Sequence, residues 1–208
     1  MTRSRRGRSP EGPTRDALAL PARGPLRGEA KLRAALRLFG ITVEGRVALD
    51  VGAAAGGFTR VLLDAGAARV YAVDAGHGQL LGSLRQSDRV VNLEATNVGD
   101  LDRAVIPDTV DVVTIDVSYL ALSEAVAQLD RVTIAPDADL IGLVKPMFEL
   151  RMGTAPVDAK TARHAADRAA AAIEAAGWSV LGVIDSPVAG ARGAVEMLLH
   201  ARCSERRK

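Results

Sequence analysis

Ala48-Leu49-Asp50-Val51-Gly52-Ala53-Ala54-Ala55-Gly56-Gly57-Phe58-Thr59 is the stretch of this 208-residue chain that decides its fold. The apolar residues up to Val51 predict a buried strand, the small residues after it a tight loop, and Phe58 the start of a helix. Gly52 to Gly57 carry almost no side-chain atoms, so a ligand can lie directly on the backbone. A second strand ends at Asp74, whose carboxylate can accept hydrogen bonds from both hydroxyls of a ribose. Together these features predict a nucleoside-containing cofactor.

The spacing of the glycines narrows the choice of cofactor. Dinucleotide-binding folds usually carry G-x-G-x-x-G, whereas glycines 52, 56 and 57 give G-x-x-x-G-G, and no G-K-[ST] triplet of a P-loop is present. The loop has no lysine or arginine to meet phosphates, and Asp50 adds negative charge beside it. A cationic, phosphate-free ligand such as S-adenosylmethionine fits better than a pyrophosphate. The alternative, a turn that only connects strand to helix, leaves Asp74 unexplained.

Length and composition predict one α/β domain with a substantial core, since 48% of the residues are hydrophobic. The sequence contains no run of 18 apolar residues, which a membrane span would require. Its arginine-rich start lacks the apolar core of a signal peptide. We therefore expect a cytoplasmic protein. Cys203 is the one cysteine, and the three histidines are scattered, so we expect neither an internal disulfide nor a metal site.

The charge is uneven along the chain. Residues 1–27 hold seven arginines against Glu11 and Asp16, and residues 204–208 are basic as well. We expect both segments to be basic tails, the first of them disordered, around one domain at residues 28–203. Basic tails can follow a phosphate backbone without reading sequence, which predicts RNA or a ribosomal subunit as partner. A purely solubilising role for these tails is equally consistent with their composition.

Between the tails the apolar pattern alternates between strands and helices. We expect helices at 29–39, 57–65, 78–85, 118–130 and 158–176, and strands at 46–51, 69–73, 90–93, 110–115, 140–144, 179–184 and 195–200. This order predicts a Rossmann-like α/β fold: a seven-stranded, mostly parallel sheet with helices on both faces. No helix separates the last two strands, which predicts an antiparallel pair at one edge.

Two charged residues fall at the ends of neighbouring strands of this sheet. Asp116 follows the strand at 110–115, and Lys145 follows the strand at 140–144. Ligands of open α/β sheets bind outside the carboxyl ends of the strands, so both side chains should face one cleft beside the glycine loop. A carboxylate can position a lysine for proton transfer, and Pro146 stiffens the chain after it. The alternative is a surface ion pair at a sheet edge.

Four segments of the chain resemble the TlyA (hemolysin-like) branch of the FtsJ-type ribose methyltransferases: Asp50–Thr59, Ala68–Asp74, Thr114–Ser118 and Val144–Glu149. The resemblance covers about residues 26–201 and implies a Rossmann-like methyltransferase fold. It implies transfer of a methyl group from S-adenosylmethionine to a 2′-hydroxyl of RNA, without a metal. The family's catalytic Lys, Asp, Lys and Glu fall on Lys31, Asp116, Lys145 and Glu196.

The resemblance also implies a role for each of these residues. Lys145 would take the proton of the attacking hydroxyl and Asp116 would orient it, while Lys31 and Glu196 would hold the hydroxyl. Twelve positions are expected to bind cofactor or substrate. Those for the cofactor are Asp50, Gly52, Ala53, Gly56, Gly57, Phe58, Asp74, Asn97 and Asp116, and those for the substrate are Arg27, Tyr119 and Met147.

The chain departs from the family pattern in the parts that would meet a substrate. TlyA proteins usually carry an RNA-binding domain before the methyltransferase domain, and residues 1–27 are too short and too polar to form one. Ala54 and Ala55 replace the usual Ser-Thr, Met147 a Gln, and Ala194 an Asn. RNA is the first hypothesis for the methyl acceptor, and a hydroxyl of a small molecule or peptide is the second. The third hypothesis, a non-catalytic binding protein, conflicts with the four retained residue types.

Overall fold

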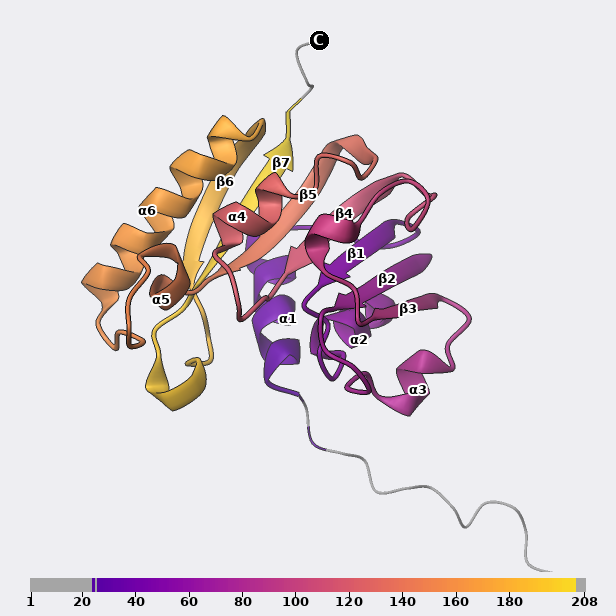
Figure 1. Cartoon of the computed structure of the whole chain (residues 1–208), viewed down its shortest axis with the longest axis horizontal. Coiled ribbons are helices and arrows are strands. Elements are labelled where there is room, and N and C mark those ends of the chain that lie inside the picture. Colours follow the sequence, from indigo (N-terminus) through magenta and orange to yellow (C-terminus); the bar gives the residue numbers. More distant parts are fainter. Residues whose placement is uncertain (1–23, 25, 205–208) are drawn as a thin grey trace, which may run out of the picture.

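The computed structural model describes residues 24 and 26–204, and it contains one seven-stranded sheet in the order β3-β2-β1-β4-β5-β7-β6 (Figure 1). Strands β1 to β5 pair in parallel, and β7 pairs antiparallel with both β5 and β6. The predicted parallel sheet with an antiparallel pair at one edge is therefore confirmed. The strands are β1 (Val47–Val51), β2 (Arg69–Asp74), β3 (Val90–Glu94), β4 (Val110–Ile115), β5 (Ile134–Val144), β6 (Trp178–Asp185) and β7 (Met197–Cys203).

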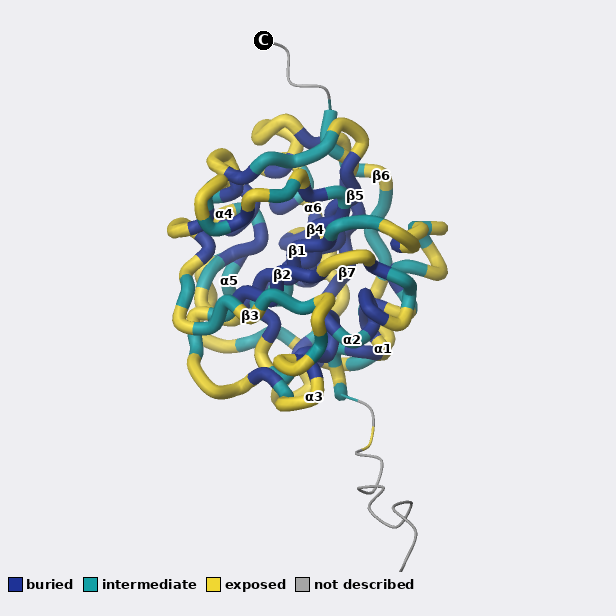
Figure 2. Tube along the Cα trace, turned by 90° about the vertical axis from the view of Figure 1, so that its right-hand side faces the viewer, coloured by how far each residue is buried: buried dark blue, intermediate teal, exposed yellow. Residues whose placement is uncertain are grey.

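Helices cover both faces of the sheet, as predicted. On one face α1 and α2 pack together with the short α3, and on the other α4 and α6 pack with α5 (Figure 1). Two apolar clusters fill the two interfaces, and the central strands between them are buried (Figure 2). The helices are α1 (Arg27–Phe39), α2 (Gly57–Asp64), α3 (Gly82–Arg85), α4 (Leu122–Ala127), α5 (Pro146–Glu149) and α6 (Ala159–Ala175), with 3₁₀ turns η1 (Val98–Asp100) and η2 (Ala191–Gly193).

Several elements differ in length from the prediction. The helix expected at 118–130 is limited to α4, because residues 118–120 form a bend and the Ala121 amide before the helix donates to the Glu124 carboxylate. The helix expected from residue 78 starts only at α3, because the Gln79 and Leu80 amides donate to Glu94 instead. Strand β5 begins six residues before the predicted start at 140, through an irregular segment. Local side-chain acceptors and strand pairing thus override the periodicity.

Helix α5 was not predicted. It is a single turn directly after Lys145, with Pro146 at its first position, where a fixed φ favours helix initiation. The Glu149 carboxylate at its end accepts hydrogen bonds from the Ser123 amide (3.2 Å) and hydroxyl (2.9 Å) at the start of α4. This buried contact fixes α5, and with it the chain around Lys145.

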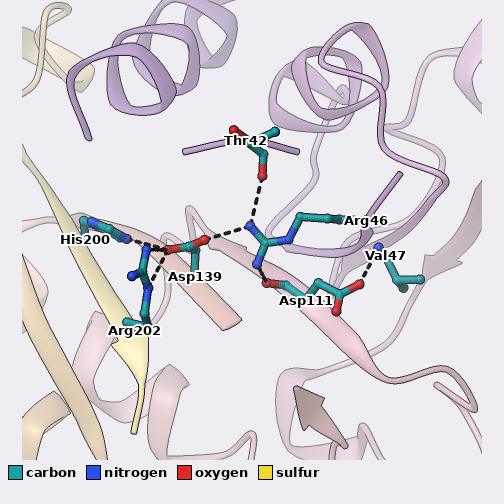
Figure 3. A network of polar contacts seen from close by, with 7 residues as sticks. All are labelled: Thr42, Arg46, Val47, Asp111, Asp139, His200 and Arg202. Carbon is teal, nitrogen blue, oxygen red and sulfur yellow. Dashed lines mark hydrogen bonds and ion pairs between the residues drawn. The ribbon is translucent and has the colours of Figure 1, made fainter. Parts of the chain in front are cut away.

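A polar network lies at the amino ends of the parallel strands. Asp139 on β5 is buried and accepts hydrogen bonds from Arg46 (2.7 Å), His200 (2.8 Å) and Arg202 (3.1 Å). Burial by itself would raise the pKa of Asp139, but these three donors hold it well below its usual range. The network therefore ties β5 to β7 and to the chain before β1. Its remaining members are Thr42, Val47 and Asp111 (Figure 3).

Most of the two predicted tails, residues 1–23, 25 and 205–208, lie outside the described residues. Among the residues that the structure describes, no helix has both the length and the apolar character that a membrane crossing requires.

Candidate active site

The glycine loop after β1 is pressed against the ends of two neighbouring strands. The Gly52 and Ala53 amides both donate to the Val73 carbonyl, at 2.8 and 3.0 Å. Gly52 has a φ of 88°, and a Cβ there would collide with the Asp116 carbonyl oxygen, so no other residue fits easily. These contacts hold the loop close to the carboxyl ends of the strands, where Gly52 and Ala53 line the cavity described below.

The Asp74 carboxylate joins this loop to the one after β2. One oxygen accepts the Ala54 amide at 2.8 Å, and the other accepts the Gly76 amide at 2.6 Å. A carboxylate offers about four acceptor sites, so both oxygens keep capacity for further donors such as ribose hydroxyls. Asp74 thus shapes the loop in addition to any role toward a ligand.

Asp50 lies beneath the loop and is fully buried. Its two oxygens accept hydrogen bonds from the hydroxyls of Thr59 (2.6 Å) on α2 and Thr114 (2.8 Å) on β4. Burial raises the pKa of Asp50 to about 6, even though these two hydrogen bonds oppose the shift. The side chain does not line the cavity described next, and it joins three elements under the loop.

A cavity of about 620 Å³ opens beside the glycine loop. Ten of the predicted site residues line it, from five different segments of the chain. They are Arg27, Lys31, Gly52, Ala53, Gly57, Phe58, Asp116, Lys145, Met147 and Glu196. Five others are not among its lining residues: Asp50, Gly56, Asp74, Asn97 and Tyr119. Tyr119, half exposed, lies in a second, smaller groove that shares Met147 and Phe148 with the cavity.

The first charged pair in the cavity is Lys145 with Asp116. Lys145 Nζ lies 2.6 Å from Asp116 Oδ1 and also donates to the Val117 carbonyl (2.8 Å) and the Ser118 hydroxyl (2.7 Å). Strands β4 and β5 are adjacent and parallel, which brings their carboxyl ends together. The predicted neighbourhood of Asp116 and Lys145 is therefore present, inside a cavity rather than on an open edge.

The second pair is Lys31 with Glu196, which joins α1 to the segment before β7. The Nζ–Oε2 distance is 2.7 Å, and both side chains are more than nine-tenths buried. Helix α1 reaches the cavity because Gly28 and Gly57 let the starts of α1 and α2 approach closely. Gly190 likewise leaves the space that the Glu196 carboxyl occupies. The four predicted catalytic residues, Lys31, Asp116, Lys145 and Glu196, therefore form two lysine–carboxylate pairs that face one cavity.

Some lining residues were not identified from the sequence. Ser118 comes two residues after Asp116, within the same segment after β4, and could have been found from that position. The loop between β6 and β7 contributes Ala189, Gly190, Ala191 and Ala194, and Pro156 comes from the loop before α6. The two loops are joined by a hydrogen bond from the Val195 amide to the Pro156 carbonyl (3.1 Å). Apart from a concentration of Gly and Pro, these small residues give no sequence signal.

Comparison with known proteins adds independent findings. A model of FtsJ-like methyltransferases matches residues 26–203. The chain is 42% identical over 185 residues to the 16S/23S rRNA (cytidine-2′-O)-methyltransferase TlyA of Mycobacterium tuberculosis, a match that covers 85% of this chain and 67% of that protein. It is 34% identical to Hemolysin A of Brachyspira hyodysenteriae, covering 84% and 75%. A hemolysin-type structure from Streptococcus thermophilus superposes with a TM-score of 0.81 at 33% identity, covering 86% and 66%.

The Rossmann-like fold, the glycine loop and the family match define an S-adenosylmethionine-dependent methyltransferase. Within that class the chain belongs to the FtsJ-like methyltransferase family. The predicted family, enzyme class and cofactor are confirmed. The chain spans about two thirds of the length of the first curated relatives that it matches.

Proposed function

We propose that this protein methylates a ribose 2′-hydroxyl of ribosomal RNA, with Lys31, Asp116, Lys145 and Glu196 as its catalytic residues. The observation that carries the proposal is the pair of lysine–carboxylate contacts in one cavity beside the glycine loop. The similarity to a protein named as an rRNA (cytidine-2′-O)-methyltransferase supports ribosomal RNA as the substrate. Such a substrate implies a cytoplasmic enzyme.

The lining of the cavity fits S-adenosylmethionine, which supplies an activated methyl group when bound. Gly52, Ala53 and Gly57 present backbone without bulky side chains, and Phe58 adds an apolar wall. Asp74 keeps free acceptor capacity next to the loop for ribose hydroxyls. We assign cofactor binding to these residues and to Asp116. Gly56, Asp50 and Asn97, which like Asp74 do not line the cavity, would act by shaping the loops around it.

The charged residues would handle the proton of the acceptor hydroxyl. A ribose hydroxyl is a weak nucleophile until its proton is removed as it attacks the methyl carbon. Three acceptors fix the position of Lys145 Nζ. Once this group has lost one of its own three protons to solvent, its lone pair would be in place to take the proton of the hydroxyl. Lys31 and Glu196 would hold the hydroxyl oxygen and its proton in line. Alignment supplies much of the rate enhancement, because the methyl donor is already activated.

The substrate would enter at the mouth of the cavity. Arg27 lines the cavity at the start of α1 and offers a cation to a phosphate, and Met147 offers an apolar contact. Tyr119 in the adjacent groove is exposed enough to stack on a base.

A methyl-transfer assay tests the proposal. The purified protein is incubated with tritium-labelled S-adenosylmethionine in three separate reactions, which contain ribosomal subunits, total RNA or a metabolite extract. We expect label in ribosomal RNA, recovered as a 2′-O-methylated nucleoside after digestion. Label confined to the metabolite extract would instead support a small-molecule hydroxyl as the acceptor. Label on a base rather than on the ribose would contradict the assigned chemistry.

A further inference from the structure

The loop between β6 and β7 holds one arginine in an unfavourable backbone conformation. Arg192 has φ 56° and ψ 27°, in the left-handed region where a residue other than glycine costs about 1 kcal/mol. Gly193 beside it has a φ of 80°, which glycine adopts freely. Non-glycine residues persist in such conformations where the surrounding structure fixes them, and they cluster at functional sites.

The surroundings of Arg192 do fix its backbone. The loop closes through the Gly190 amide, which donates to the Ala194 carbonyl at 2.8 Å. Two hydrogen bonds hold the base of the loop. The Ser186 amide donates to the Glu196 carbonyl (3.0 Å), and the Val195 amide donates to the Pro156 carbonyl (3.1 Å). The conformation of Arg192 is therefore a property of the whole loop.

The position of the loop relates Arg192 to the active site. Gly190, Ala191 and Ala194 line the cavity, while Arg192 at the crest between them is exposed. At the base of the same loop Glu196 pairs with Lys31 inside the cavity. Arg192 therefore stands on the wall that carries one of the proposed catalytic residues, at the solvent side of that wall.

The charges around the cavity are unevenly compensated. Inside the cavity, Lys31 is paired with Glu196 and Lys145 with Asp116, so the charges of these four side chains cancel. Among the described residues, Arg27 and Arg192 take part in no ion pair. Arg27 lies on the α1 wall, and Arg192 belongs to the loop that forms another wall. The uncompensated positive charge is thus at the rim, where an anionic ligand would meet it.

We propose that Arg192 contacts a backbone phosphate of the RNA next to the nucleotide being methylated. This inference rests on the proposed function. A ribose within RNA carries a phosphodiester on each side, and an arginine on the rim can donate two parallel hydrogen bonds to one of them. The cation on the α1 wall, Arg27, is available to the other. Phosphate contacts of this kind position the strand and do not read its sequence.

The test compares three variants with the wild-type protein. Arg192→Asn removes the charge and keeps a residue that tolerates the left-handed conformation, and Arg192→Lys keeps the charge. Arg37→Gln removes one charge from the exposed far end of α1, away from the cavity, and serves as the control. The measurements are KM and kcat on the ribosomal subunit that accepts methyl groups, the salt dependence of RNA binding, and the affinity for S-adenosylmethionine by calorimetry.

We expect Arg192→Asn to raise KM for RNA about tenfold, with kcat and cofactor affinity almost unchanged. Its plot of log affinity against log salt should be shallower by about 0.7, the value for one lost phosphate contact on a single strand. Arg37→Gln should stay within about twofold of wild type. Arg192→Lys keeps the charge but loses the paired hydrogen bonds, so its KM should fall between those of wild type and Arg192→Asn.

Three results would overturn the inference. An unchanged KM in Arg192→Asn, with wild-type RNA methylation intact, would overturn it alone. Weakened cofactor binding in the same variant would assign Arg192 to the cofactor instead. Absence of RNA methylation by the wild-type protein would overturn the proposed function together with this inference.

Discussion

Lys145 Nζ lies 2.6 Å from Asp116 Oδ1, and the other two acceptors of this ammonium group, the Val117 carbonyl and the Ser118 hydroxyl, come from the next two residues of the chain. One short segment after β4 therefore fixes the end of a side chain from the residue that follows β5. The parallel pairing of β4 and β5 holds the two segments at the same level, with Ile115 opposite Gly142.

Removal of the Lys145 amine should abolish methyl transfer while the cofactor still binds. For Lys145→Ala we expect a loss of at least about 10²-fold in kcat, the usual contribution of a positioned general base. Ser118→Ala removes one of three acceptors and should cost about tenfold or less. Tritium-methyl transfer and calorimetry with S-adenosylmethionine measure both effects. Full activity in Lys145→Ala would refute the mechanism.

The Lys31–Glu196 pair should be coupled in stability. Glu196→Gln leaves a buried lysine without its counter-charge, which should lower the free energy of unfolding by about 3 kcal/mol. Lys31→Met should have a similar effect, and the double variant should recover most of the loss without recovering activity. Urea denaturation of the four proteins gives the coupling energy. Additive losses in the double variant would show that the two side chains do not stabilise each other.

Gly190 should be needed for the position of the Glu196 carboxyl. Its φ of −66° suits any residue, so Gly190→Ala adds no backbone strain, but the new methyl group would overlap the Glu196 side chain. We expect a loss of activity of about tenfold or more with little change in cofactor affinity. Gly153→Ala is the control, since no atom lies within 4 Å of a Cβ there. Equal activity of the two variants would contradict the prediction.

The effect of Thr59→Val should depend on pH, because Thr59 donates to the buried Asp50 carboxylate. The pKa of Asp50 is raised to about 6, so the folded protein holds the ionised form above that pH and the protonated form below it. The hydrogen bond stabilises the ionised form. Thr59→Val should therefore cost about 1 to 2 kcal/mol at pH 8 and less at pH 5, measured by urea denaturation. The same cost at both values would show that Asp50 does not change its ionisation between pH 5 and pH 8.

Acid should weaken the Asp139 network. The pKa of this carboxyl is lowered in the folded protein, so its stabilising effect is present above the unfolded value near 4 and is lost as the pH falls below it. Asp139→Asn should lower the free energy of unfolding by about 2 kcal/mol at pH 7, and the difference from wild type should shrink below pH 4. Thermal unfolding between pH 3 and pH 7 measures this. A constant difference would mean that the ionisation of Asp139 is unimportant.

The sheet and its binding edge could be predicted because they depend on local patterns. The apolar run before Gly52, the following strand that ends at Asp74 and the alternation with helices are each visible in short windows of sequence. Asp116 and Lys145 could be placed together from their positions at strand ends alone. Their contact inside one cavity follows from the strand order.

The rest of the site depends on contacts between distant segments. Lys31 and Glu196 are separated by 165 residues, and only the family resemblance singled them out. The role of Asp50 as a buried acceptor for two threonines depends on the packing of α2 and β4 under the loop. Helix α5 and the β6–β7 loop are too short and too rich in small residues to show a period. Tertiary contacts, rather than local preference, decide these parts.

Because the contact between Lys31 and Glu196 forms only when distant elements have docked, enzymatic activity also reports on the completion of folding. Helix α1 belongs to the apolar cluster on one face of the sheet, whereas β7 is inserted between β5 and β6. An intermediate that lacks either docking step could keep most of its secondary structure, yet it would lack one half of the pair. After dilution from urea, methyl-transfer activity should therefore recover later than the helical circular dichroism signal. The delay between the two would measure the rate of the last docking step in refolding.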